Sequence, residues 1–401
     1  MKKVVTDKQK IEEVLTRSVE EVLPTREGLR ELLLSGRRLR IYIGTDATGT
    51  SLHLGHATNY MILEKFRQLG HEVVFLIGDF TARIGDPTDK GDIARKQLTR
   101  GEVLHNVKTW IDQIRPVIDV DNKDNPVKIL YNNDWLAALT LENVLNLASN
   151  FTVQQVLERD MFQERIKKEK PLYLHELLYP LMQGYDSVAM DVDVEMCGMD
   201  QKFNALAGRT LLRKLKNKEK FVFITTLLEN PKTGEKMMSK SLGTGVFLDA
   251  DGDKMFGGIM SQPDENMRQL FIDCTRLDMV EIESILQEKN PRDSKIRLAT
   301  EIVTMYHGRD VAKVAKENFI KTFSEGGVPE DINEFLVVPG VFLKDALLEH
   351  KLVSSGSDFR RLVDERAVSV NNNKIEDPKI IISENSVVRV GKRRFIKFII
   401  A

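Results

Sequence analysis

The sequence predicts an α/β fold class, with a parallel-sheet domain first, an all-helical domain next and a small α/β domain at the end. In the first two thirds of the 401 residues, short β-branched runs alternate with amphipathic helical stretches, which is typical of a parallel sheet flanked by helices. From about Asp253 to Thr322 the pattern is mostly helical, and from Val341 two short helices precede several strands. A chain of this length is too long for one compact core.

The first unit of the α/β domain runs strand, loop, helix, strand. The strands are "LRIYIG" (39–44) and "EVVFLIG" (72–78), which are short and almost continuously apolar, as buried parallel strands are. Between them "LHLGHATNYMILEKFRQLG" is predicted as a helix, with Ser51 as its N-cap and Gly70 as its C-terminal stop.

The remaining elements follow from the same patterns. The first 23 residues, "MKKVVTDKQKIEEVLTRSVEEVL", are predicted as a charged amphipathic helix. "SEGGVPEDINEFLVVPG" is rich in glycine, proline and acidic residues and suits a linker. Further strands are predicted at 127–130, 192–196 and 221–226.

Composition indicates a globular protein that folds in water, because hydrophobic residues make up 42% and charged residues 30% of the chain. No apolar run approaches a membrane span, so the cytoplasm is the default location. Cys197 and Cys274 fit no disulfide or zinc spacing, and we expect reduced thiols. The net charge is -1, yet the tail from Lys344 carries 12 Lys and Arg against 8 Asp and Glu. This local charge of +4 could face phosphate.

The stretch "HLGH" places His53 and His56 just after the first predicted strand. A zinc site on a helix favours histidines four apart with a third ligand, and Gly55 supplies none. From this stretch alone, a structural role for the two histidines is slightly favoured over a functional one. The position changes this balance, since free N–H groups at a helix N-terminus after a parallel strand attract phosphate. We therefore expect both histidines to donate to one phosphate.

A second stretch, "KTGEKMMSKSLGTG" (232–245), carries lysines and hydroxyls among glycines. Such composition usually belongs to a solvated surface loop. Its functional alternative is a mobile phosphate clamp, in which Lys240 supplies a point charge while Ser239 and Ser241 donate short hydrogen bonds.

Together, "HLGH" and "MSKS" in an alternating α/β chain resemble the HIGH and KMSKS motifs of class I aminoacyl-tRNA synthetases. The first lysine of KMSKS is Met237 here, with Lys236 displaced by one position, which leaves Lys240 as the better candidate. With "LYPLMQGYDS" and "DQKFN" included, nearly the whole chain resembles the bacterial tyrosyl-tRNA synthetases.

The resemblance implies a division of the chain into four parts. Residues 1–228 would form a Rossmann-like catalytic domain that binds ATP and tyrosine, and residues 229–330 the KMSKS loop and the helical domain. Residues 331–339 would be a linker, and residues 340–401 a small α/β, S4-like RNA-binding domain.

The resemblance also implies the site residues. Tyr42 and Asp186 would bind the substrate phenol, while Tyr179, Gln183 and Asp86 would hold its α-ammonium group. Gly198, Asp200 and Gln201 would lie against the ribose and the tyrosine. The residues implied for ATP are Gly44, Asp46, Thr48, His53, Gly55, His56, Gly198, Asp200, Ser239, Lys240 and Ser241, of which His53, His56 and Lys240 would be catalytic.

The residues of "LYPLMQGYD" agree with these roles in their chemistry. Tyr179, Gln183 and Asp186 are spaced four and three apart, hence on one helix face. Burying a phenol, an amide and a carboxylate together costs free energy unless something polar pairs with them. A polar helix surface or a closed structural network remains the alternative. A site of this kind would reject phenylalanine, because the groups that bind the phenol would be left unpaired.

The tail, "FLKDALLEHKLVSSGSDFRRLVDERAVSVNN", resembles an S4 RNA-binding domain, with Arg360, Arg361 and Arg366 on its helical part. The alternative is a small domain with a charged, solvated surface. The positive charge of the tail and the resemblance favour RNA, bound largely through its shape and backbone.

The expected reaction joins L-tyrosine to ATP as tyrosyl-adenylate with release of pyrophosphate, then transfers tyrosine to the terminal ribose of tRNA(Tyr). Mg²⁺ would enter with ATP rather than in a protein cage, and the resemblance implies a homodimer without an editing domain. Three alternatives stay open: an RNA-binding protein without aminoacylation, a generic HxGH nucleotidyltransferase and a tryptophanyl enzyme. The set of Tyr42, Asp186 and Lys240 counts against the first. The S4-like tail and the Tyr-x-x-x-Gln-x-x-Asp segment disfavour the second, and a tryptophanyl enzyme predicts neither the phenol-binding pair nor this tail.

Overall fold

The computed structural model describes residues 3–85, 98–228, 245–288, 290–324, 334–371, 373–391 and 394–400. The chain divides into two compact units, residues 1–312 and 313–401. Within the described ranges, no helix combines the length and the apolar character that a bilayer crossing requires.

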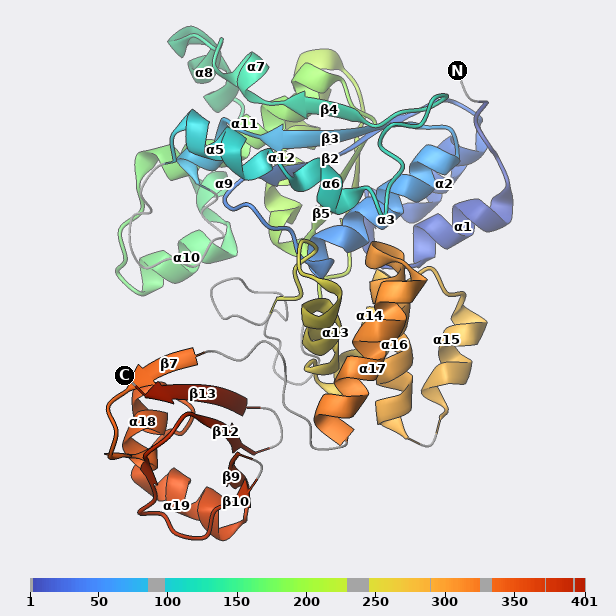
Figure 1. The fold of residues 1–401 in the computed structure, drawn as a ribbon. Coiled ribbons are helices and arrows are strands. Elements are labelled where there is room, and N and C mark those ends of the chain that lie inside the picture. The colour runs from blue at the N-terminus through green and yellow to red at the C-terminus, as the bar shows by residue number, and fades with distance from the viewer. Residues whose placement is uncertain are drawn as a thin grey trace. The chain divides into compact units, whose positions relative to one another are not determined.

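The first unit is built on a six-stranded sheet with the order β1-β6-β5-β2-β3-β4. Figure 1 shows its strands β2, β3 and β4 side by side. All five strands predicted for this part form, displaced by two residues at most, and they pair in parallel. The fold class is therefore as predicted. The bounds are β1 (Val19–Leu23), β2 (Arg40–Asp46), β3 (Glu72–Gly78), β4 (Lys128–Tyr131), β5 (Val194–Gly198) and β6 (Phe221–Thr225).

The prediction of one helix over the first 23 residues is wrong. Helix α1 (Lys8–Thr16) ends early, Ser18 has a positive φ of 60°, and β1 pairs antiparallel with the edge strand β6. Ser18 breaks the helix, and the exposed backbone of β6 offers the next five residues a hydrogen-bonding partner that periodicity could not reveal.

The two faces of the sheet are covered by different helices. Tyr42, Val74 and Leu76 point toward α11 (Leu174–Met190), where Met190 joins their cluster. The alternate residues face α3 (Leu54–Gln68), whose Tyr60 and Phe66 lie edge-on against Phe75 and Phe223. Helix α12 (Lys202–Lys216) packs along α11.

The start of α3 differs from the prediction. Gly70, with a φ of +91°, does follow the end of the helix, but the N-cap is His53 rather than Ser51. Leu52 and Leu54 instead pair in extended form with residues 246–248, and the Ser51 hydroxyl donates to Asp249 over 2.6 Å. These contacts hold the segment before His53 out of the helix.

Four further helices in the first unit follow the sheet, as the helical pattern predicts. Arg17, from beyond α1, donates to the carbonyls of Ile272, Thr275 and Leu277 at 2.9, 2.8 and 2.6 Å. These carbonyls lie at the end of α14, where backbone acceptors need partners. The helices are α13 (Gly252–Met260), α14 (Met267–Cys274), α15 (Met279–Leu286) and α16 (Pro291–His307), and α17 (Arg309–Ser324) continues across the boundary between the units.

Shorter helices surround the sheet in the first unit. They are α2 (Arg26–Leu34), α4 (Thr81–Ile84), α5 (Arg100–Val107), α6 (Trp110–Ile114), α7 (Asn133–Leu136), α8 (Leu141–Ala148), α9 (Val153–Leu157) and α10 (Asp160–Lys167), with the 3₁₀ turns η1 (Met199–Gln201) and η2 (Asp264–Asn266).

The second unit has its own five-stranded sheet, in the order β10-β9-β12-β13-β7, and its own core, centred on Phe359 and Phe398. The predicted linker contains a strand, because β7 pairs in parallel with β13. The predicted domain limits themselves stay predictions. The elements are β7 (Glu334–Val337), β8 (Val341–Phe342), α18 (Leu343–Glu349), α19 (Gly356–Asp364), β9 (Val368–Val370), β10 (Asn373–Lys374), β11 (Ile381–Ile382), β12 (Ser386–Val390) and β13 (Arg394–Ile400).

Candidate active site

The carboxyl ends of the parallel strands bring together residues that are far apart in the sequence. Asp46, the last residue of β2, accepts from the Thr81 hydroxyl over 2.6 Å and from the Tyr179 hydroxyl over 2.9 Å. A Cβ at Gly78, at the end of β3, would overlap the Asp46 carboxylate. Asp46, predicted for ATP, and Tyr179, predicted for the ammonium group, are thus joined by one hydrogen bond.

Tyr42 and Asp186 lie deep in this region. Tyr42 on β2 is 1% exposed and Asp186 on α11 is 2% exposed. The Asp186 carboxylate accepts from Trp135 Nε1 at 2.7 Å and from Asn132 Nδ2 at 3.2 Å. The Tyr42 hydroxyl lies 3.0 Å from Ser187 Oγ. Each of the two predicted phenol-binding groups is therefore buried and has hydrogen-bonding partners within the protein.

Burial also perturbs both groups electrostatically. The pKa of Asp186 is raised well above its usual value, chiefly because burial disfavours the charged form, and the donors Trp135 and Asn132 act in the opposite direction. The pKa of Tyr42 is likewise raised, first by burial and then by the charges of Glu195 and Asp186. The geometry links the two groups through Ser187, which contacts the Tyr42 hydroxyl and directly follows Asp186 on α11.

Gln183 lies one turn before Ser187 on the same helix and is held from both sides. Its Nε2 donates to Glu195 Oε1 at 3.1 Å, and its Oε1 accepts from Asn204 at 2.9 Å. Asn204 also donates to Gln201 Oε1 over 2.8 Å. The two glutamines predicted to contact tyrosine are thus coupled through one buried amide.

His53 and His56 stand together at the start of α3. Their ring centroids are 3.8 Å apart, and the His53 backbone N–H donates to His56 Nδ1 at 3.2 Å. Since Nδ1 is an acceptor, a neutral His56 carries its proton on Nε2. Both rings are half-buried, so each keeps an accessible side. Gly55, between them, lies in the first turn of the helix.

Residues that follow the "MSKS" stretch lie against this helix start. The Leu54 N–H donates to the Val246 carbonyl over 3.0 Å, and His53 forms a β-bridge with Phe247. Three predicted residues of that stretch, together with Asp86, lie outside the described residues: Ser239, Lys240 and Ser241.

The other residues predicted for ATP lie at strand ends. Gly44 and Thr48 are exposed, on and just after the end of β2. Gly198 ends β5, where a Cβ would come within 2.8 Å of the Asp200 carboxylate. Asp200 itself is exposed in η1. These positions share the carboxyl edge of the sheet with Asp46, which is where doubly wound sheets bind ligands.

Comparison with known proteins identifies the family. The tRNA synthetases of class I (W and Y) match residues 34–324. The tyrosine–tRNA ligase of Carboxydothermus hydrogenoformans is 41% identical over 405 residues, which cover 96% of this chain and 97% of that one. The chain belongs to the tyrosine–tRNA ligase family.

Two further relatives agree with this membership. The tyrosine–tRNA ligase of Legionella pneumophila (strain Paris) is 41% identical over 392 residues, with 96% of both chains covered. A C-terminally truncated mitochondrial tyrosyl-tRNA synthetase of Coccidioides posadasii has a TM-score of 0.63 at 25% identity, covering 77% of this chain and 90% of that one. The resemblance drawn from "HLGH", "MSKS" and "LYPLMQGYDS" is confirmed, while the roles of individual residues stay predictions.

Several polar residues of the site were missed in the sequence. Asn132, Trp135 and Ser187 lie beside predicted residues, and only the structure shows that they contact them. Glu195 and Lys220 did leave a signal, since one is a charge within a predicted strand, 192–196, and the other directly precedes a predicted strand, 221–226. A buried charge needs a partner, and the two residues prove to be partners of each other.

The three arginines predicted for RNA lie on the surface of the second unit. Arg361 pairs with Asp358 at 2.8 Å and with Glu365 at 2.9 Å. Arg366 pairs with Glu376 at 2.9 Å, and Arg360 is exposed on α19. Exposed pairs of this kind contribute little to stability and leave the arginines accessible to a phosphate.

Proposed function

We propose that this chain activates L-tyrosine with ATP, giving tyrosyl-adenylate and pyrophosphate, and then transfers the tyrosyl group to the terminal ribose of tRNA(Tyr). The ligase activity itself goes with the family. The observation that carries the residue assignment is geometric: the phenol Tyr42 and the carboxylate Asp186 are both buried, and the Tyr42 hydroxyl lies 3.0 Å from Ser187 Oγ, on the residue that follows Asp186 on α11.

The substrate's phenol would meet Tyr42 and Asp186. A phenol has one proton to donate and lone pairs to accept, which suits a hydroxyl and a carboxylate together. Trp135 and Asn132 hold the Asp186 oxygens from behind, which fixes the direction that the carboxylate presents. Phenylalanine would leave both groups without the substrate hydroxyl, and each hydrogen bond lost in this way would cost about 0.5–1.5 kcal/mol.

The substrate's ammonium group would meet Tyr179 and Gln183, with Asp86 as a predicted third partner. Tyr179 lies one turn before Gln183 on α11 and is tied to Asp46. Gln183 turns its amide nitrogen to Glu195, and its oxygen, which accepts one hydrogen bond from Asn204, has a second lone pair that can accept from a cation. The residues proposed for the ammonium group, Tyr179 and Gln183, thus precede Asp186, proposed for the phenol, along the same helix.

The phosphates of ATP would lie at the start of α3. His56, with its Nε2 proton, and His53 can both donate there, and the helix dipole favours negative charge. Lys240 is proposed as a further donor, because residues 246–248, a few positions after it, pair with residues 52–54. The residues that follow the "MSKS" stretch, Val246 and Phe247, therefore lie beside His53 and Leu54.

The first chemical step would need no protein base, because tyrosine's carboxylate is ionised at neutral pH and attacks the α-phosphorus directly. The residues act by positioning and by stabilising charge at the phosphates. Within the described ranges, no three His, Cys, Asp or Glu side chains form a group that could hold a metal ion. Mg²⁺ would enter with ATP, held mainly by the phosphates and water, because this ion keeps several waters and prefers substrate phosphates, and it would neutralise phosphate charge there.

For tRNA we propose the second unit as an additional binding surface, with Arg360, Arg361 and Arg366 contacting the RNA backbone. Its positive charge supports this role. A cytoplasmic location follows as a proposal from the family's role in protein synthesis.

A homodimer is also proposed. Large apolar side chains are exposed on α8, α9 and the start of α11, with Leu141, Leu145, Val153 and Leu174 between 62% and 77% exposed. Helices α8 and α9 both pack against α11, so these side chains belong to neighbouring elements. A second copy would cover them, since exposed apolar patches commonly mark interfaces.

Pyrophosphate exchange into ATP, measured with each amino acid in turn, tests the proposal. Exchange should depend on tyrosine, and exchange independent of tyrosine would refute the assignment. Asp186→Ala should abolish tyrosine selection while the KM for ATP survives. An equal loss for both substrates would mean that Asp186 does not read the phenol.

A further inference from the structure

We infer that the buried ion pair between Lys220 and Glu195 is a positioning device for the tyrosine site, which fixes Tyr42 through Ser187 and orients the amide of Gln183. The inference rests on the proposed function. Neither charged residue would touch the substrate, so both would be positioning residues rather than catalytic residues.

The fold places the pair at the floor of the site. Tyr42 and Glu195 are register partners in the adjacent parallel strands β2 and β5, so their side chains lie side by side on one face of the sheet. Lys220 directly precedes β6, the next strand along. Gln183 and Ser187, one turn apart on α11, come down onto the same face.

The contacts run without a break from the ion pair to the two ends of the site. Lys220 Nζ contacts Glu195 Oε2 and donates to Ser187 Oγ at 2.9 Å. Ser187 lies 3.0 Å from the Tyr42 hydroxyl and donates to Glu195 over 3.2 Å. The other Glu195 oxygen accepts from Gln183 at 3.1 Å. One carboxylate thus binds the ammonium of Lys220, the hydroxyl of Ser187 and the amide of Gln183.

The charges of Glu195 and Lys220 fix which group donates and which accepts in the hydrogen bonds around them, and neutral residues would not fix this. A carboxylate can only accept and an ammonium can only donate. Glu195 therefore selects the nitrogen of the Gln183 amide. Asn204 donates to the amide oxygen from the other side, and the second lone pair of that oxygen can accept from a cation. Lys220 can only donate to the Ser187 hydroxyl, which lies beside Tyr42. With the Gln183 amide reversed, its NH₂ would face the substrate's ammonium group and repel it.

Stability alone does not account for this pair. Both side chains are fully buried, Lys220 at 0% and Glu195 at 2% exposure, and apolar residues of similar volume often stabilise a core as well as such pairs do. The absence of a side chain at Gly208 on α12 makes space for the Lys220 ammonium group. A Cβ at this position would lie 2.6 Å from Lys220 Nζ and 2.7 Å from Ser187 Oγ.

Paired substitutions in the full-length chain test the inference. Lys220→Met with Glu195→Met removes both charges together, so no lone buried charge remains. We expect the KM for tyrosine in pyrophosphate exchange to rise about tenfold, with the KM for ATP unchanged. Lys220→Gln with Glu195→Gln keeps donors and acceptors and should recover part of the loss.

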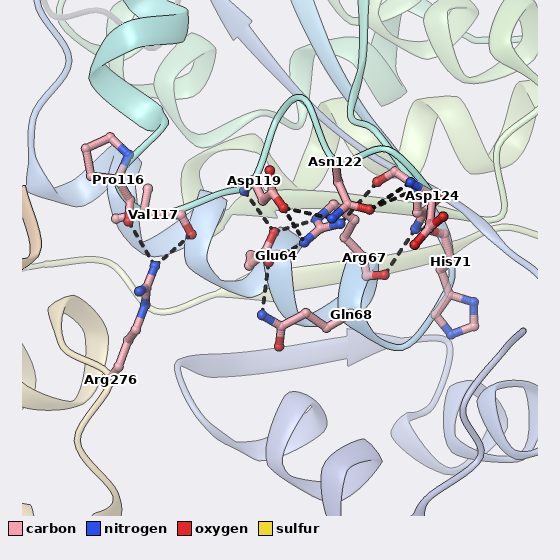
Figure 2. A network of polar contacts seen from close by, with 11 residues as sticks. Glu64, Arg67, Gln68, His71, Pro116, Val117, Asp119, Asn122, Asp124 and Arg276 are labelled. Carbon is pink, nitrogen blue, oxygen red and sulfur yellow. Dashed lines mark hydrogen bonds and ion pairs between the residues drawn. The ribbon is translucent and has the colours of Figure 1, made fainter. Parts of the chain in front are cut away.

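A matched control exists on α3, where Arg67 donates to both Glu64 oxygens at 2.7 Å with side chains only 5% and 11% exposed (Figure 2). Glu64→Met with Arg67→Met should change the melting temperature without changing either KM. A double variant at Lys220 and Glu195 that folds and keeps the wild-type KM for tyrosine, or raises both KM values equally, would overturn the inference.

Two further measurements distinguish a failure of the inference from a failure to fold and from a failure of the proposed function. If the apolar pair does not fold, Ser187→Ala removes the link to Tyr42 while leaving the charges in place. An unchanged KM for tyrosine in Ser187→Ala would then overturn the role assigned to the link. A wild-type chain without tyrosine-dependent exchange would instead refute the proposed function.

Discussion

Trp135→Phe is the most direct test of how Asp186 is held. Trp135 Nε1 donates to Asp186 Oδ1 at 2.7 Å, and Asn132 donates to the other oxygen at 3.2 Å. Phenylalanine keeps a six-membered aromatic ring to pack against the cluster of Tyr42 and removes the Nε1 donor together with the smaller ring that carries it. A buried carboxylate would then lose the shorter of these two bonds.

The magnitude follows from the charge on the acceptor. A hydrogen bond to a charged group contributes about 1.5–3 kcal/mol, which corresponds to about ten- to a hundredfold in an equilibrium constant. We therefore expect the KM for tyrosine to rise by about this factor, while the KM for ATP changes little. Phenylalanine discrimination should fall with it, because the weakened acceptor is the group proposed to bind the phenol.

The pH profile gives a second readout with a defined sign. Burial raises the pKa of Asp186, and the bond from Trp135 opposes that rise. Losing the bond moves the pKa further up, so the carboxylate is protonated over a wider range as pH falls. If the ionised carboxylate binds the phenol, the KM for tyrosine falls as pH rises through the pKa of Asp186. In Trp135→Phe this fall should occur at higher pH than in the wild type.

The assay is pyrophosphate exchange as a function of tyrosine concentration over the whole pH range in which the enzyme stays folded, and the other tryptophan supplies the control. Trp110 is buried, whereas Trp135 is half-buried, and Trp110 Nε1 donates to the neutral carbonyl of Gly49 at 3.1 Å. Trp110→Phe should leave the pH profile for tyrosine in place. The reasoning fails if Trp135→Phe keeps the wild-type profile, or if both variants shift it alike.

The remaining predictions concern other parts of the chain. Burial lowers the pKa of His71 to about 4, so protonation opposes folding: about 3 kcal/mol of stability should be lost as pH falls from about 6.5 to 4, and urea unfolding should show His71→Gln losing less. Leu174→Asp should dissociate a dimer in sedimentation experiments, whereas Val280→Asp, 82% exposed on α15, should not; unchanged sedimentation of both would reject the interface. Arg360→Glu should weaken tRNA charging severalfold and leave pyrophosphate exchange intact, and equal loss in both assays would argue against a role in RNA binding.

The sequence could predict those parts of the fold that depend on local patterns. The runs at 39–44 and 72–78 are continuous and apolar, and they form β2 and β3. It could not predict β1, whose five residues have a helix-like mixture of charges and become a strand only because β6 lies beside them. The start of α3 was missed for a similar reason, since the pairing of Leu52 with residue 248 joins segments about 200 residues apart.

The same distinction applies to the site. Spacing alone placed Tyr179, Gln183 and Asp186 on one face, and the structure has them on one helix. Nothing local connects Glu195 with Tyr42, because their proximity follows from the order of strands in the sheet. Contacts set by strand order, such as those of Ser187 with Glu195 and Lys220, need the assembled fold before they can be recognised.

Asp46 shows how such contacts join the two substrates. It lies at the end of the strand that carries Tyr42, and it binds Tyr179 on α11 and Thr81 on α4. Thr81 in turn accepts from Asn132 at 3.0 Å, which also donates to Asp186. A displacement of Asp46 by a bound nucleotide would therefore reach both ends of the tyrosine site through hydrogen bonds. Since Asp46 is predicted to line the nucleotide site, binding of ATP and binding of tyrosine should be coupled, and by reciprocity each should change the affinity for the other by the same factor.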